Sequence, residues 1–328
     1  VTKRIPYLCG FWRFANAYYN DKRKDDRMEL KDFAALIAVG AQGQLGDQYE
    51  ISDTVTIKNN STEYTGIMFQ KKTEHVAPTI YIEDLYVGYI NQEVTIKDAI
   101  KEVIGRYEKS KKGLQRINGL SVDYASCQGR IIYRLISRER NSVLLNDIPY
   151  IPFLDMAITF HLVVSINDSC MQSLKITREL QQKWGVSVEQ LLKMAKRNTP
   201  ELLPARVCEL SQLMECYMNT KEWTPEPEED LTNEEKIDMI VVSNELGING
   251  AAVVLYDGVM EQIANEYDSD LYLLPSSIHE MIVVPCGDED LYNTFSSMVN
   301  SINQGYVDED EVLSDRVYIY RKEEKKFE

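Results

Sequence analysis

Residues 271–284 read LYLLPSSIHEMIVV, and this stretch decides the fold class. Its two apolar runs, 271–274 and 281–284, have the length and the branched side chains that are typical of short strands. The polar residues between the runs predict a connecting turn. The stretch therefore predicts two neighbouring strands with a polar, chemically varied connection.

The segments on either side of this stretch mix helices with strands. Helical spacing of apolar residues predicts helices at 30–37, 96–107, 187–198 and 291–302. Extended patterns predict strands at 55–58, 66–70, 79–82, 130–137, 157–166, 173–176 and 316–321. Because helices and strands do not alternate strictly, we expect an α+β fold with mixed, largely antiparallel sheet elements and packed amphipathic helices.

Local signals predict where several helices begin and end. The glycines at 40, 43 and 46 are expected to break the first helix. The helix that follows Ser187 is expected to stop before Pro200. Residues 208–217 are expected to add a short helix, and Asp257 to cap the helix over 258–267.

An acidic segment that contains two prolines, 222–238, is expected to divide the chain. It carries few apolar residues and cannot bury itself, which is typical of a linker. Residues 1–27 are basic and differ from the rest, so we expect a disordered extension or a start near Met28. The predicted organisation is an extension over 1–27, an α+β domain over 28–221, a linker over 222–238 and an α+β domain over 239–328.

Composition excludes several classes of function. The 328 residues include 36 basic and 52 acidic side chains, which gives a net charge of −16. Such a surface repels phosphate, so nucleic acid is not expected as a partner. No apolar run is long enough to span a membrane. The six cysteines form no CxxC pair, which predicts neither a disulfide framework nor a zinc site but free thiols in the cytoplasm.

The sharpest candidate site lies in the connection over 276–280. Ser277, His279 and Glu280 offer a hydroxyl, a base that titrates near neutrality and a carboxylate, which makes them candidate catalytic residues. Ser276 and His279 are candidate ligand-binding residues. The alternative interpretation is a structured turn, in which the hydroxyls and Glu280 bond to backbone groups.

Other motifs add little chemistry. The chain contains no P-loop, dinucleotide-binding, nucleophile-elbow or zincin pattern. Of the two remaining histidines, His161 lies in an apolar run and is expected to be a satisfied core residue. The acidic clusters at 268–270, 288–290 and 308–311 carry ligands suited to Ca²⁺ or Mg²⁺, but we interpret them as solvated charge. No metal and no cofactor is expected.

Short segments across residues 28–320 together resemble an uncharacterised bacterial family, a domain of unknown function. Its most specific element is Leu-Pro-Ser-Ser-Ile-His-Glu at 274–280. The other matching segments are 58–60, 65–67, 77–81, 134–136 with Asn141, 153–157, 184–186, 198–200, 250–252 and 312–315. The resemblance implies a cytosolic bacterial protein, carries no established activity, and makes 276–280 the place to look.

Three hypotheses follow for the function. The leading one is an uncharacterised protein that binds a protein or a small ligand without demonstrated catalysis. The second is a hydrolytic or metal-dependent enzyme that uses Ser277, His279 and Glu280. The third is an acidic inhibitor or immunity-type protein whose surface engages a basic partner.

Overall fold

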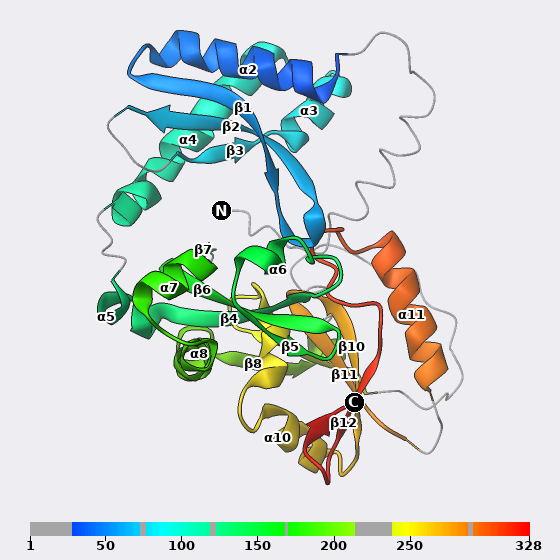
Figure 1. Ribbon diagram of the computed structural model, residues 1–328. Helices are drawn as coiled ribbons and strands as arrows, with labels where there is room; N and C mark the ends of the chain where they lie inside the picture. The colour runs from blue at the N-terminus through cyan, green and yellow to red at the C-terminus, as the bar shows by residue number, and fades with distance from the viewer. Residues whose placement is uncertain (1–27, 73–76, 119–122, 168–169, 214–237, 288–290) are drawn as a thin grey trace. The chain divides into compact units, whose positions relative to one another are not determined.

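The computed structural model describes residues 28–72, 77–118, 123–167, 170–213, 238–287 and 291–328 (Figure 1). The chain folds into two compact units, one ending at Asp123 and the other covering Tyr124–Glu328. All strand pairings within the described residues are antiparallel. The predicted α+β fold is therefore confirmed. The predicted extension over 1–27, His75 and the cluster 288–290 lie outside the described residues.

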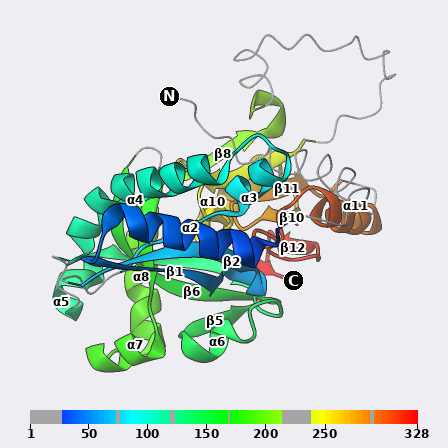
Figure 2. The ribbon, with the colours of Figure 1, turned by 90° about the horizontal axis from the view of Figure 1, so that it is seen from above.

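The first unit is a three-stranded sheet with helices on one face. Its elements are α2 (Leu30–Leu45), β1 (Tyr49–Ile57), β2 (Glu63–Lys71), β3 (Thr79–Tyr81), α3 (Glu83–Ile90) and α4 (Ile96–Asn118). The sheet has the order β1-β2-β3, and α2 and α4 lie side by side over it (Figure 2). Phe69 of β2 stacks on Tyr107 of α4, with 4.3 Å between the ring centroids. This pair anchors a core that also buries Phe33 and Ile37.

Helix α2 corrects one prediction. The glycines at 40 and 43 do not break it, because the helix runs on to Leu45 and ends at Gly46, where φ is +76°. Gly40 faces α4, and a Cβ atom at this position would overlap Cδ1 of Ile100. Glycine is present there because the two helices approach closely, and this contact outweighs its low helix propensity.

The second unit contains two sheets. The four-stranded sheet consists of β4 (Ile131–Ser137), β5 (Tyr150–Phe153), β6 (Met156–Asn167) and β7 (Cys170–Lys175). The long strand β6 is central: β4 pairs with one edge of it, while β5 and β7 pair with the other. The short helix α6 (Leu144–Asp147) connects β4 to β5, while α5 (Tyr124–Cys127) precedes β4 and α7 (Arg178–Trp184) follows β7.

The six-stranded sheet has the order β13-β12-β10-β11-β9-β8. Its strands are β8 (Ala205–Glu209), β9 (Ile240–Asn244), β10 (Leu271–Ser277), β11 (Glu280–Pro285), β12 (Tyr318–Arg321) and β13 (Lys326–Phe327). The 3₁₀ helix η4 (Gly250–Leu255) and α10 (Val259–Glu266) share one core with it, and α11 (Tyr292–Gly305) packs on a separate cluster. Gly258, not Asp257, is the N-cap of α10.

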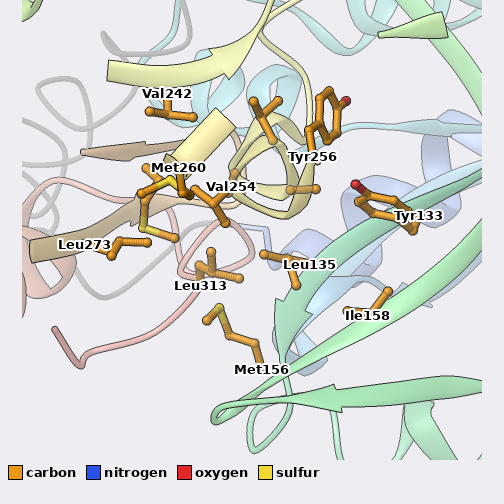
Figure 3. Close-up of a cluster of buried hydrophobic side chains, with 14 of the residues drawn as sticks. Tyr133, Leu135, Met156, Ile158, Val242, Val254, Tyr256, Met260, Leu273 and Leu313 are labelled. Carbon is orange, nitrogen blue, oxygen red and sulfur yellow. The ribbon is translucent and has the colours of Figure 1, made fainter. Parts of the chain in front are cut away.

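One core joins the two sheets of the second unit. Figure 3 shows Leu135 and Met156 of the four-stranded sheet in the same cluster as Val242, Leu273 and Leu313. These side chains are all at most 2% exposed. Each contributes about 1.5–3 kcal/mol of hydrophobic stabilisation when it is buried. The core therefore fixes the two sheets against one another.

The helix after Ser187 is longer than the sequence predicts. Ser187 and Gln190 form a capping box at its start, and α8 (Val188–Leu202) continues past Asn198 and contains Pro200. Asn198 donates to the carbonyl of Ile131 at 3.0 Å, and Thr199 accepts the N–H of Tyr133 at 3.1 Å. These side chains satisfy backbone groups at the free edge of β4, and the helix must continue to position them.

The observed division of the chain differs from the predicted one. The segment 222–238 lies almost wholly outside the described residues, but β8 before it pairs with β9 after it, with Cys208 opposite Val241. Residues on both sides of the segment therefore share one sheet. Cys208 lies in β8, and the short helix predicted over 208–217 is present at 210–213, the part of that range beyond the strand that the structure describes. The boundary between compact units falls near Asp123, inside the predicted domain 28–221.

Candidate functional site

The connection over 276–280 is a tight turn between β10 and β11. Ser277 pairs with Glu280, so only Ile278 and His279 lie outside the strands. The strands extend beyond their apolar runs because a bulge between Pro275 and Ser277 accommodates the proline, which cannot donate to a ladder. The structure thus brings all four sequence-predicted site residues into one hairpin.

Three other segments hold the backbone of this turn. The N–H of Ile278 donates to the carbonyl of Glu311 at 2.8 Å, and the carbonyl of Ile278 accepts from Ala251 at 3.2 Å. Ser243 Oγ donates to the carbonyl of His279 at 2.8 Å. A Cβ atom on Gly250 would overlap Ser243 Oγ and lie 2.5 Å from the carbonyl oxygen of His279. Only glycine lets η4 approach the turn this closely.

The imidazole of His279 has a partner on each nitrogen. Nδ1 accepts the backbone N–H of Asn249 at 3.1 Å, and Nε2 lies 3.2 Å from Oε1 of Glu311. Because Nδ1 accepts, the ring proton is assigned to Nε2, which donates to the carboxylate. The ring is thereby fixed in one tautomer and one orientation.

The two serines and Glu280 form separate contacts. Ser276 Oγ donates to Oε1 of Glu280 at 3.1 Å, while Ser277 Oγ accepts the backbone N–H of His279 at 3.0 Å. Glu280 is 7% exposed. Burial, and then the charge of Glu311, raise the pKa of the Glu280 carboxyl to about 7.

This geometry is not that of a nucleophile and its base. A serine–histidine pair needs the hydroxyl on one ring nitrogen and the orienting carboxylate on the other. Glu311 fills the carboxylate position, but a backbone N–H of Asn249 occupies the other nitrogen. Neither serine hydroxyl bonds to the ring. The contacts correspond to the alternative interpretation, a structured turn.

Three carboxylates of the acidic clusters have side-chain partners within the described residues. Asp270 pairs with Arg321 at 3.0 Å, and Asp268 pairs with Lys322. Glu311 contacts His279. In the described part of the chain, no group of three or more His, Cys, Asp or Glu side chains is placed to hold a metal ion.

A polar network that the sequence analysis missed lies beside this turn. Asp155, between β5 and β6, accepts from Ser314 Oγ at 2.8 Å and from the hydroxyl of Tyr318. Burial raises the pKa of the Tyr318 phenol, and the contact with Asp155 adds to this. Asp315 pairs with Arg140 at 2.8 Å. The segment from Glu311 to Tyr318 therefore links the 276–280 turn to the four-stranded sheet.

Arg134 is the second feature that the sequence analysis missed. It lies in β4 opposite Thr159 of β6; the residue as a whole is half-buried, while its Nε atom is fully enclosed. Nη2 donates to Ser173 Oγ at 2.6 Å, whereas Nε is buried without an acceptor. No ion pair joins Arg134 to a carboxylate of the described residues. Burial lowers the pKa of its guanidinium to about 10.

His161 lies beside this guanidinium. As predicted, it is a buried histidine with a polar contact, since Nε2 is 3.2 Å from Oγ1 of Thr159. Burial, and then the charges of Arg134 and Lys175, lower the pKa of His161 well below its usual value. The ring is therefore neutral at pH 7. A charged residue within the apolar run 131–136 was the sequence signal for this cluster.

The fold and these contacts define an α+β protein with a buried cationic cluster and a polar hairpin turn. No helix in the described part of the chain has both the length and the apolar character that a membrane span requires. The chain belongs to a family of unknown function (DUF5688), whose model matches residues 30–322. No curated protein and no solved structure matches it. The resemblance to a domain of unknown function is confirmed at the level of the family.

Proposed function

We propose that this protein acts by binding a small ligand rather than by catalysis at the 276–280 turn. The observation that carries the proposal is Arg134, whose buried guanidinium has a hydrogen-bond donor without an acceptor. A buried charge without a counter-charge destabilises a fold by several kcal/mol, on the order of 3–5 where a partner has been removed. Perturbed titratable groups cluster at functional sites, so we propose that a bound ligand supplies the missing partner.

The contacts of the 276–280 turn support the second part of the proposal, that this turn is not a catalytic site. Its hydroxyls, its imidazole and the Glu280 carboxyl bond to one another or to neighbouring backbone. These bonds hold the hairpin against η4 and the segment at Glu311. We therefore assign the turn a structural role, and propose that its residues act on ligand binding only through the stability of the fold.

A ligand screen on the full chain tests this function. Native mass spectrometry and thermal denaturation are measured with a collection of small metabolites, for the wild type and for His279→Ala. We expect at least one compound to raise the melting temperature and to be recovered with unchanged mass. Conversion of a compound by the wild type but not by His279→Ala would instead support the enzyme hypothesis and contradict this proposal.

A further inference from the structure

We propose that Arg134, Thr159, His161 and Ser173 form a binding site for the oxyanion of a small ligand, a carboxylate or a phosphate group. The inference rests on the proposed binding function and names the chemistry that the ligand must carry. Arg134 comes from β4, Thr159 and His161 from β6, and Ser173 from β7.

The register of the four-stranded sheet places these side chains on one face. Arg134 is opposite Thr159, and cross-strand partners point to the same side of a sheet. His161 follows Thr159 by two residues and is opposite Lys175, while Ser173 lies two residues from Lys175. Tyr133 and Leu135, the neighbours of Arg134, point to the opposite face and into the main core. The polar cluster is therefore separate from that core.

The donors of this face suit an oxyanion. A guanidinium presents N–H groups in a planar fork that matches the two oxygens of a carboxylate or a phosphate. Nη2 of Arg134 is engaged by Ser173, and Nε remains without an acceptor. The hydroxyl of Ser173 accepts from Nη2 and still has its own proton to donate, whereas the hydroxyl of Thr159 donates to the carbonyl of Arg134 at 3.5 Å. Within the described residues, no carboxylate forms an ion pair with Arg134 to neutralise the charge.

His161 would respond to an anion at this position. In the structure it faces two cationic groups, Arg134 of β4 and Lys175 of β7, and the hydroxyl of Thr159 on its own strand. These charges and burial keep the ring neutral. A bound anion offsets both cations and favours the imidazolium, so binding takes up a proton and is tighter at lower pH.

The first experiment compares anion effects on two matched variants of the full chain. Arg134→Met removes the buried guanidinium, and Arg138→Met removes one positive charge from an exposed residue just after the same strand. Melting temperature and calorimetric affinity are measured with phosphate, acetate and chloride at constant ionic strength. If only phosphate raises the melting temperature, the ligand carries a phosphoryl group. If acetate raises it, the ligand carries a carboxylate.

The expected result separates a ligand site from a structural arginine. In the absence of anion, Arg134→Met should melt higher than the wild type, because an unpaired buried charge is replaced by an apolar side chain. Its affinity for the anion should fall at least tenfold, while Arg138→Met keeps the wild-type affinity. A lower melting temperature of Arg134→Met together with an unchanged anion response would overturn the proposal. No stabilisation of the wild type by phosphate or acetate would overturn it as well.

The second experiment measures the uptake of a proton when the anion binds. Calorimetry in two buffers of different ionisation enthalpy should show proton uptake on anion binding by the wild type and none by His161→Gln. Equal uptake in both proteins would contradict the role of His161. A metabolite that binds Arg134→Met and the wild type equally would refute this site and leave the binding function standing. Absence of any ligand would refute both.

Discussion

At the residue scale, Glu280 is a carboxyl group in a position that disfavours its charge. It is buried in β11, and its carboxyl accepts a hydrogen bond from the hydroxyl of Ser276 at 3.1 Å. The neighbouring carboxylate of Glu311 is engaged by His279 and repels a second negative charge. Burial and this repulsion raise the pKa of Glu280 from 4.5 to about 7. The carboxyl group therefore loses its proton near neutral pH in the folded state and near pH 4.5 in the unfolded state.

This shift predicts the pH dependence of stability. Because the folded state binds the proton more tightly, the free energy of unfolding falls as pH rises from 4.5 to about 7, by up to about 3 kcal/mol. Glu280→Gln keeps an acceptor for Ser276 and carries no charge. We expect it to match the wild type at pH 5 and to be more stable by about 1–3 kcal/mol at pH 8.

Urea denaturation of both proteins at these two pH values measures the effect, with Glu324→Gln, an exposed carboxylate, as control. The control should follow the wild type at both pH values. A variant that is equally destabilised at pH 5 and pH 8 would show that Glu280 is ionised throughout and stabilised by partners.

The sequence could place the residues of the turn but not their partners. Ser276, Ser277, His279 and Glu280 are neighbours in the chain, so local pattern was enough to group them. Glu311 reaches His279 only because a segment about thirty residues later returns to the hairpin. The sequence also did not identify Arg134 as a candidate site residue. An apolar run with a single arginine predicts a strand, but the surroundings of that arginine depend on how β4, β6 and β7 pair.

At the scale of elements, apolar patterns predicted most strands because burial of one face is a property of the strand itself. The strands predicted at 55–58 and 66–70 lie in β1 and β2, and those at 157–166 and 173–176 lie in β6 and β7. Strand ends were less predictable, since the bulge at Pro275 depends on contacts with distant backbone. Helix α2 was predicted too short because its glycines serve a contact with α4 rather than a break.

This explanation predicts opposite effects for two alanine substitutions in α2. Gly40→Ala gains about 1 kcal/mol of helix propensity, but overpacking against Ile100 costs about 1–3 kcal/mol, so we expect net destabilisation. Gly43 is exposed and has nothing within 4 Å of an added Cβ atom. Gly43→Ala should therefore stabilise the unit by up to about 1 kcal/mol.

Adding Ile100→Val, which removes Cδ1, should recover part of the loss in Gly40→Ala but not alter the effect of Gly43→Ala. Chemical denaturation of the single and double variants gives the coupling energy. Equal stabilisation by both alanines would mean that the close approach of α2 to α4 does not determine the residue at position 40.

At the scale of the whole molecule, the acidic, apolar-poor composition of the segment 222–238 predicts a linker between domains, but strands on either side of it pair with each other. A boundary requires that few contacts cross it. Here β8 and β9 pair across the segment 222–238, and Leu135 and Met156 before it share a core with Val242 and Leu273 after it. Composition reports whether a segment can bury itself, whereas pairing between distant strands is decided by the rest of the fold.

The arrangement predicts how fragments of the chain behave. Residues 239–328 alone should show no cooperative thermal transition, because they lose β8 and the partners of Val242 and Leu273 in the shared core. Residues 124–328 keep both sheets and should unfold cooperatively.

A full chain that is cleaved once within 222–237 should remain associated at native pH. Its two parts should separate only on denaturation, because the β8–β9 ladder and the shared core join them across the cut. Circular dichroism and size-exclusion chromatography measure these outcomes. A cooperative transition of 239–328 alone, or separation of the cleaved chain without denaturant, would restore the boundary that the sequence predicts.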